Sequence, residues 1–201
     1  MPYVFNYENN NVGDETEFRR NLVCLRCSHL NPNKNPPRCR RNVCIGLDLC
    51  WQHLEQINHI KIRVSTNLDA GKGLFAFQKG GAPNAIIFRE NEIICEYIGE
   101  HLTDDELTER YGEDGTAPYA TDTGIAGDNI DCAVRRGVGA LINHAPNRQV
   151  NCKWRTNRNN NRVFIVASKT IRNNQELFLN YGARYVMNPP NERYSTKYRR
   201  N

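Results

Sequence analysis

The 201-residue sequence has no uninterrupted apolar run of about 18 residues, the length that a membrane-spanning helix needs. Residues 1–18 contain asparagine and acidic side chains, where a secretory signal has a basic end followed by an apolar stretch. We therefore expect neither a membrane span nor export. A repeat with a period of about 20 to 50 residues is also missing, which argues against a solenoid.

Apolar residues are not abundant. Hydrophobic residues make up 39% of the sequence and charged residues 24%, with a mean hydropathy of −0.71. This supply is thin for a globular protein but well above that of a disordered chain. The length fits one ordinary domain with a small satellite module. We predict four segments: a flexible arm (1–18), a Cys/His-rich module (19–58), the main domain (59–186) and a basic tail (187–201).

Eight cysteines in a chain that is not expected to be exported indicate an intracellular, reducing compartment, where thiolates bind metals more often than they form disulfides. Five of them lie between Cys24 and Cys50, around a proline-rich stretch that cannot be helical. A loop-rich segment with few apolar residues needs a staple such as a metal ion in order to fold. Six side chains are candidate ligands for an ion that usually takes four: Cys24, Cys27, Cys39, Cys44, Cys50 and His53.

Spacing narrows the choice of ligands. Cys50 and His53 are one helical turn apart, and the pattern Cys27-x11-Cys39-x10-Cys50-x2-His53 resembles short Cys-Cys-Cys-His zinc modules of plant and viral proteins. We predict a structural Zn²⁺ ion bound by these four residues. The alternatives are that Cys24 or Cys44 replaces one of them, that a second ion shares the six, or that some thiols are only buried small apolar groups.

Charge is distributed unevenly along the chain. The net charge is +1 over residues 1–60, −7 over 61–130 and +11 over 131–201, which adds up to +5. The acidic residues crowd between Glu90 and Asp114, where they would attract a basic substrate, and the basic end suits nucleic acid. The simpler interpretation of either stretch is a solvated surface.

From Lys61 onward, short apolar or alternating runs separated by Gly, Pro and Asn predict a mainly β domain of small sheets. The expected strands are 61–64, 74–77, 85–88, 93–98, 163–167 and 176–181. One clear helix is predicted over 104–111, with Thr103 and Glu106 forming a capping box and Gly112 ending it. Residues 158–161 look like a hairpin turn between strands 152–156 and 163–167.

Three segments carry the chemical signal. They are the glycine turn Gly71-Lys72-Gly73, the pair Asn143-His144, and the stretch 171–182 with Tyr181 near its end. Taken singly, they are a turn, a core pair and an edge strand. In this order, about 70 and 40 residues apart, they resemble the SET-domain family of protein-lysine methyltransferases. The resemblance runs from about residue 61 to 185, with support from 96–100, Tyr119 and 130–133.

This resemblance implies a SET-domain β-clip architecture with few short helices and a C-terminal pseudoknot that brings Asn143-His144 against the strand ending at Tyr181. Tyr181 and Tyr119 would line the lysine channel as catalytic residues. The groups expected to bind S-adenosyl-L-methionine are Lys72, Gly73, Leu74, Asn143, His144 and Tyr181.

The implied activity is methyl transfer from S-adenosylmethionine to a lysine side chain, with histone tails or another lysine-rich protein as substrate. Arg148, Lys153, Arg155, Arg158 and Arg162 are then candidates for contact with nucleosomal DNA. The zinc module, the compact domain and the abundant asparagine are similar to SET proteins of large DNA viruses, which implies a location in the nucleus, that of the host if the protein is viral, or in the cytoplasm. Some compact relatives act as dimers.

The sequence also departs from the family pattern. Leu179 stands where Phe or Tyr is usual, which leaves the number of methyl groups open, and Ala140 stands where Arg often precedes the Asn-His pair. No cysteine follows Tyr181, so we hypothesise that an aromatic residue of the tail, Tyr185, Tyr194 or Tyr198, covers the channel. Two other functions are considered: a catalytically weak SET fold that serves as a chromatin or protein interaction module, and a zinc-dependent nucleic-acid binder.

Overall fold

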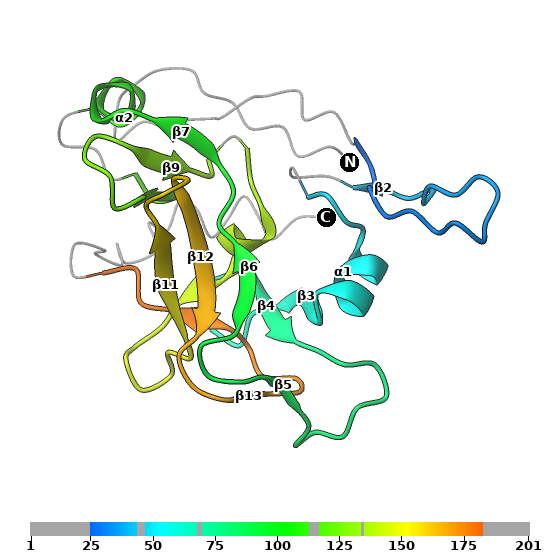
Figure 1. The fold of residues 1–201 in the computed structure, drawn as a ribbon. Helices are drawn as coiled ribbons and strands as arrows, with labels where there is room; N and C mark the ends of the chain where they lie inside the picture. The colour runs from blue at the N-terminus through cyan, green and yellow to red at the C-terminus, as the bar shows by residue number, and fades with distance from the viewer. Residues whose placement is uncertain (1–24, 44–46, 68–69, 113–116, 134, 183–201) are drawn as a thin grey trace.

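The computed structural model describes residues 25–43, 47–67, 70–112, 117–133 and 135–182. Over these residues the predicted fold class is confirmed, because the chain forms small two- and three-stranded sheets with two short α-helices (Figure 1). The predicted arm, the alternates Cys24 and Cys44, and the tail with its three tyrosines lie outside the described residues, and the predicted segment boundaries stay predictions.

The N-terminal part is a narrow ribbon that projects from the body of the molecule (Figure 1). In it, β1 (Leu25–Arg26) pairs antiparallel with β2 (Asn42–Val43). Helix α1 (Trp51–Ile57) follows, a second helix that we did not predict. Its start carries no recognisable signal, since Cys50 makes no side-chain cap and the first turn has no acidic residue. Burial of Leu54 stabilises it instead.

Two hairpins frame the core. Strand β3 (Ile60–Val64) pairs antiparallel with β4 (Lys72–Ala76), and their loop ends at Gly71, whose φ of +67° suits glycine. Strand β11 (Cys152–Asn157) pairs with β12 (Arg162–Ala167), as predicted, and Asn161 in the turn has a φ of +53°.

The three-stranded sheet β11-β12-β6 supplies much of the core. Its third strand, β6 (Ile93–Glu96), pairs antiparallel with β12. Val163 and Ile165 of β12 are fully buried. A smaller pair, β5 (Ile86–Phe88) and β13 (Ile171–Arg172), lies below it in Figure 1.

A second three-stranded sheet carries the predicted helix. Strands β7 (Glu100–Leu102), β9 (Asn129–Asp131) and β8 (Ala120–Asp122) are antiparallel, in that order. Helix α2 (Asp104–Tyr111) begins with the expected capping box and ends at Gly112. The fully buried Asp131 carboxylate accepts hydrogen bonds from Arg110 (2.7 Å) and from the Tyr111 hydroxyl (2.9 Å), which fixes α2 to the sheet.

The last sheet joins two distant segments in parallel. A short 3₁₀ helix (Val138–Leu141) leads into β10 (Asn143–His144), which pairs with β14 (Phe178–Leu179). Strand β14 is shorter than the predicted 176–181. Before it, Glu176 forms only an isolated antiparallel bridge with Phe75 of β4, and after it the Tyr181 amide donates to the His144 side chain and not to a partner strand. In the described residues, no helix is long and apolar enough to cross a membrane.

Candidate active site

The C-terminal strand lies against the loop that follows Asn143-His144. Next to the β10–β14 pairing, the Ala145 amide donates to the Leu179 carbonyl (3.1 Å). At the other end of the loop, Asn151 accepts from the Phe178 amide through its side chain (2.8 Å) and donates from its own amide to the Phe178 carbonyl (3.2 Å). Residues 178–179 are therefore held from both ends of the 143–151 loop, the arrangement expected of the pseudoknot.

The glycine turn meets this strand through a buried carboxylate. Glu176 is 6% exposed and accepts hydrogen bonds from the Ser65 hydroxyl (2.6 Å) and from the Thr66 amide (2.6 Å) and hydroxyl (2.5 Å). A Cβ at Gly73 would overlap this carboxylate and would lie 3.0 Å from the Asn143 amide nitrogen. Glycine is required at position 73 because the two segments approach too closely for a side chain.

Asn143 and His144 link the same turn to the strand that ends at Tyr181. The Asn143 side chain donates to the Lys72 carbonyl (3.1 Å), and the His144 carbonyl accepts from the Asn67 side chain (3.2 Å). The His144 Nδ1 atom lies 3.1 Å from the Tyr181 amide nitrogen, which donates to it. The two rings are 5.5 Å apart.

Burial lowers the pKa of His144, so its ring stays neutral at neutral pH and can accept the Tyr181 N–H. The hydroxyl of Tyr181 donates to the Ile142 carbonyl at 2.5 Å, which fixes the direction of the phenol. Leu74 belongs to the same neighbourhood, because its carbonyl accepts from the Leu177 amide (2.8 Å). All six residues predicted to bind the cofactor are therefore brought together by these contacts.

Tyr119 joins Tyr181 in a set of aromatic residues around the core, two of which sequence reasoning missed. The missed residues are Tyr97, whose hydroxyl donates to the Tyr119 carbonyl (2.8 Å), and Trp154, whose indole N–H donates to the Asn180 carbonyl (3.2 Å). Tyr97 and Trp154 pack edge to face at 5.1 Å. Burial raises the pKa of Tyr97, so its hydroxyl remains a donor. Trp154 lies within β11 and Tyr97 follows directly after β6, and no sequence pattern marks either of them as part of the site.

Arg136 is a third residue that sequence reasoning missed. It is 9% exposed, its guanidinium lies 4.1 Å from the centre of the Tyr119 ring, and its Nε donates to the Cys132 carbonyl (3.2 Å). A buried cation is thus fixed on the face of a predicted channel residue. Leu179, at the position that departs from the family pattern, is 1% exposed and belongs to the core.

The predicted metal ligands also converge. Among the described residues, Cys27, Cys39, Cys50 and His53 bring one ligand atom each to within 4.8 Å of all the others. The His53 Nδ1 atom lies 3.2 Å from the Cys27 sulfur and 3.4 Å from the Cys50 sulfur. Three thiolates and an imidazole at these separations suit a four-coordinate ion with bonds of about 2.0 to 2.3 Å, so the donor set fits Zn²⁺.

The thiols of this cluster differ in their proton affinity. Burial opposes a thiolate at Cys27, but hydrogen bonds from the backbone of Cys50 and His29 and from nearby thiols outweigh it and lower the Cys27 pKa. Burial raises the pKa of Cys50. One thiolate is thus favoured before a metal binds, and the ion's charge would favour the others.

The acidic stretch is less available to a substrate than its charge implies. Arg162 donates to Glu96 (2.7 Å), Arg110 donates to Glu100 (3.0 Å), and Glu106 closes the capping box of α2. Glu90, Asp105 and Glu109 remain exposed, and Glu113 and Asp114 lie outside the described residues.

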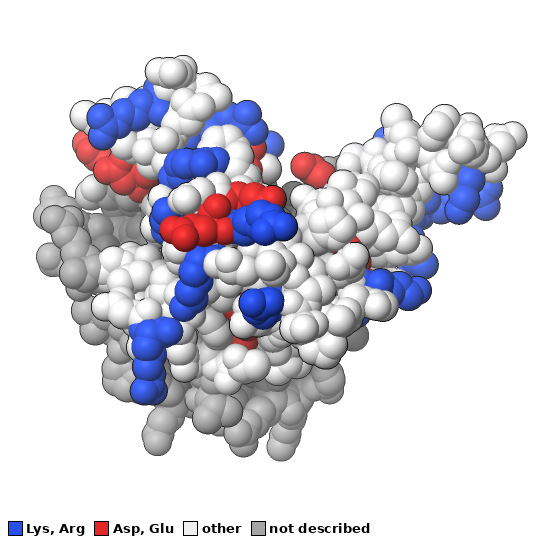
Figure 2. Space-filling model, turned by 60° about the horizontal axis from the view of Figure 1, so that its bottom comes forward, with Lys and Arg blue, Asp and Glu red and all other residues white. Residues whose placement is uncertain are grey.

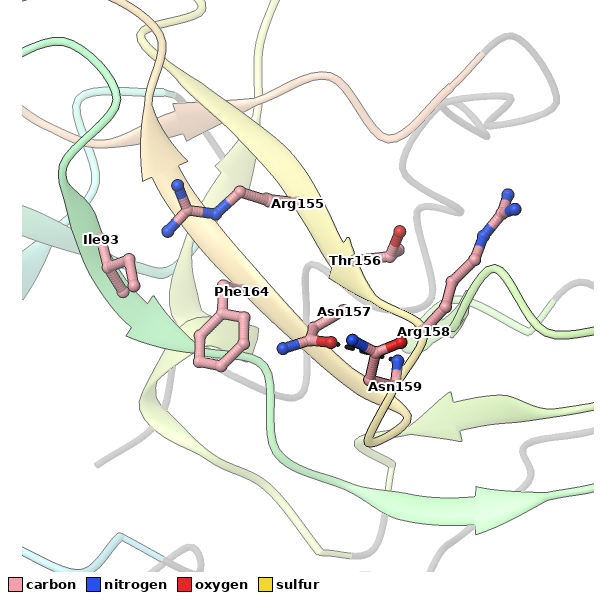
Figure 3. A pocket seen from close by; sticks show the side chains of 7 residues that line it. All are labelled: Ile93, Arg155, Thr156, Asn157, Arg158, Asn159 and Phe164. Atoms are coloured by element: carbon pink, nitrogen blue, oxygen red, sulfur yellow. Dashed lines mark hydrogen bonds between the residues drawn. The ribbon is translucent and has the colours of Figure 1, made fainter.

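A separate hollow of about 430 Å³ opens at the end of the β11–β12 hairpin (Figure 3). None of the predicted cofactor or channel residues lines it. Its lining is mixed, with the apolar Ile93 and Phe164 beside polar and basic side chains. It therefore contributes nothing to the site around Tyr181.

Comparison with known proteins finds similarity to one domain family. Residues 86–182 match the family model described as the SET domain. Among curated proteins, none matches this sequence. A crystal structure of the Chaetomium thermophilum polycomb repressive complex 2 (PRC2) is similar, with a TM-score of 0.50 and 27% identity over 66% of this chain and 16% of that chain.

Two further PRC2 structures are similar. One shows an active complex in the stimulated state (TM-score 0.47, 28% identity, 61% of this chain and 15% of that chain). The other shows ctPRC2 in an autoinhibited conformation bound to S-adenosylmethionine (TM-score 0.47, 26% identity, 68% and 16%). This chain thus spans about one sixth of the chains that it matches. The motifs, the fold and the family match together make residues 86–182 similar to a SET domain.

Proposed function

We propose that this protein is an S-adenosylmethionine-dependent protein-lysine N-methyltransferase that acts on lysine-rich basic proteins, with histone tails as the expected substrate. The observation that carries the proposal is the junction of the glycine turn, the Asn143-His144 segment and the strand ending at Tyr181. Three segments far apart in sequence meet there through directed hydrogen bonds. The match of residues 86–182 to the SET-domain model supports an activity of the methyltransferase type.

The cofactor would be held where the glycine turn at residues 71–73 meets the pseudoknot, in which the 143–151 loop contacts β14. Gly73 has no side chain there, and its nearest neighbours are the Glu176 carboxylate and the Asn143 amide, which donates to the Lys72 carbonyl. S-adenosylmethionine would supply a methyl group activated by a sulfonium. The chain's own residues have to position the accepting amine and keep water away from it.

The main chemical difficulty is the protonation of lysine. With a reference pKa of about 10.4, only about one lysine amine in 2,500 is neutral at pH 7, a deficit of roughly 4.6 kcal/mol. A channel lined by Tyr119 and Tyr181 lowers the lysine pKa by desolvation, and the Arg136 cation beside Tyr119 adds like-charge repulsion. The Tyr181 oxygen, whose proton points at Ile142, keeps a lone pair that can accept an amine N–H.

The proposed function also includes a metal ion, a surface that attracts the substrate, and a location in the cell. We propose that Cys27, Cys39, Cys50 and His53 bind a structural Zn²⁺, and that the exposed acidic residues Glu90, Asp105 and Glu109 attract a basic tail. The action on histones implies chromatin and the nucleus. The similarity to SET proteins of large DNA viruses stays a prediction, as do the DNA contact of the basic end and a dimer.

A mixture of core histones incubated with the protein and cofactor provides the test. Mass spectrometry should detect added methyl groups on lysine, and Asn143→Ala should reduce them by at least about tenfold because the turn loses its anchor to the knot. Asn159→Ala, in the exposed hairpin turn, serves as the matched control and should not change the yield. Cofactor binding without any methylation would instead favour the interaction-module function.

A further inference from the structure

The projecting ribbon carries charge of one sign. Residues 25–43 contain five basic residues and no acidic residue. Figure 2 shows lysine and arginine side chains, without acidic ones, on the outer part of the lobe at the right. All five basic side chains are exposed: Arg26, Lys34, Arg38, Arg40 and Arg41.

Two of these cations shape the ribbon. Arg38 donates to the carbonyls of Cys27 (3.2 Å) and Arg26 (3.0 Å), which ties the two sides of the ribbon together. The Arg41 guanidinium lies 5.0 Å from the centre of the Trp51 ring. Cys27 and Cys39, from the two sides of the ribbon, bring their sulfur atoms to within 4.8 Å of each other in the Cys/His cluster. The charges therefore sit on a fixed scaffold.

The other three cations are available to a ligand. Within the part of the chain that the structure describes, the side chains of Arg26, Lys34 and Arg40 form no hydrogen bond or ion pair. The acidic side chain of Glu55 in the following helix is already paired with Lys61 (3.0 Å). Nothing on the ribbon itself offsets its charge.

The basic stretch of the β11–β12 hairpin differs from the ribbon. Arg162 is paired with Glu96, and Lys153 donates to the Asn91 side chain (2.7 Å). In Figure 3 Arg155 lies near the apolar Ile93 and Phe164, whereas Arg158 points away from them. Part of the charge that the sequence placed there is neutralised within the protein.

We infer that the ribbon of residues 25–43 binds double-stranded DNA through its phosphates. Like charges repel a lysine-rich protein from this surface, whereas a duplex with its dense phosphates is attracted to it. Single strands are bound by rows of stacking aromatic residues. In the described structure Trp51 is the one exposed large aromatic residue, and Arg41 already lies over its ring. The duplex is therefore the favoured partner, and this inference goes beyond methyl transfer.

Fluorescence anisotropy with a labelled duplex of about 20 base pairs tests the inference, using the full chain loaded with one equivalent of Zn²⁺. Neutralising Arg26, Lys34 and Arg40 together, each to Gln, should weaken binding at about 0.1 M salt by at least about tenfold. The slope of log K against log salt should fall in magnitude by about 3, since each phosphate contact contributes about 0.9. The charge-matched comparison replaces Arg155, Arg158 and Lys169, all exposed, by Gln and should change both quantities clearly less than the ribbon variant does, because the ribbon is the main DNA contact.

Three results would overturn the inference: no duplex binding by the unaltered protein, loss of binding in the hairpin variant instead, or tighter binding of an equally long single strand. Thermal unfolding of both triple variants checks that they fold. Methylation of an isolated histone-tail peptide should be the same in the ribbon variant as in the unaltered protein. If the unaltered protein methylates nothing, the proposed function fails while the DNA result still stands.

Discussion

At the scale of single residues, the account depends on the contact between Gly73 and Glu176. The carboxylate is buried, and its described partners are neutral donors, Ser65, Thr66 and, more weakly, Asn143. It therefore cannot move away without leaving those donors unpaired. Gly73 tolerates this position only because it lacks a side chain.

A double-mutant cycle measures this contact. Gly73→Ala should destabilise the protein by about 1 to 3 kcal/mol through overpacking, and Glu176→Ala by a similar amount through unpaired donors. The double variant should cost less than the sum by about 1 kcal/mol, because the added methyl group then meets no carboxylate. Denaturant unfolding gives the four free energies. Pairing Gly73→Ala with the exposed Glu92→Ala should be additive, and equal non-additivity in both cycles would refute the contact.

The lowered pKa of His144 predicts that the free energy of unfolding depends on pH. Burial lowers its pKa below the ordinary value of 6.5, so its contribution to the free energy of unfolding is complete above that pH and is lost as the pH falls below it. The unaltered protein should lose stability between about pH 7 and pH 5. His144→Asn keeps an acceptor near the Nδ1 position without titrating there and should reduce the decline, leaving the part due to His53, whose pKa burial also lowers. Replacement of the exposed His101, His101→Asn, should leave the loss of stability unchanged. An equally unchanged loss in His144→Asn would contradict the role given to His144.

At the scale of secondary-structure elements, sequence motifs predicted those elements that are stabilised by interactions within a few residues. Helix α2 and the β11–β12 hairpin were predicted because a capping box and an asparagine-rich turn act within a few residues. Helix α1 was missed because the burial of Leu54, which stabilises it, is a tertiary effect.

The proposed metal module should bind one ion per chain. Titration with Co²⁺, a spectroscopic substitute for Zn²⁺, should give one tightly bound ion per chain with thiolate-to-metal absorption. Cys39→Ser should weaken binding by at least about a hundredfold because a first ligand is lost. Cys24→Ser and Cys44→Ser should bind normally. If either of them loses the ion while Cys39→Ser keeps it, the ligand set is wrong.

At the scale of the whole molecule, the site is made by contacts that local sequence cannot encode. Asn143 meets Phe178 across 35 residues, and Ser65 meets Glu176 across 111. The resemblance to a family predicted the first contact, whereas the second, together with the positions of Tyr97, Trp154 and Arg136, required the three-dimensional structure. These side chains occupy places set by packing and not by any pattern along the chain.

The central claim is that Tyr181 faces the reacting groups at the end of a lysine channel. The most direct test compares the rate of label transfer from radioactive S-adenosylmethionine to core histones by the unaltered protein and by Tyr181→Phe, with cofactor affinity measured by calorimetry. We predict that the rate falls by about a hundredfold or more while affinity stays within about threefold, because the amine loses its orientation. Tyr111→Phe, which removes a buried hydroxyl bound to Asp131, should keep most of the rate. Equal transfer by the unaltered protein and Tyr181→Phe would contradict the account.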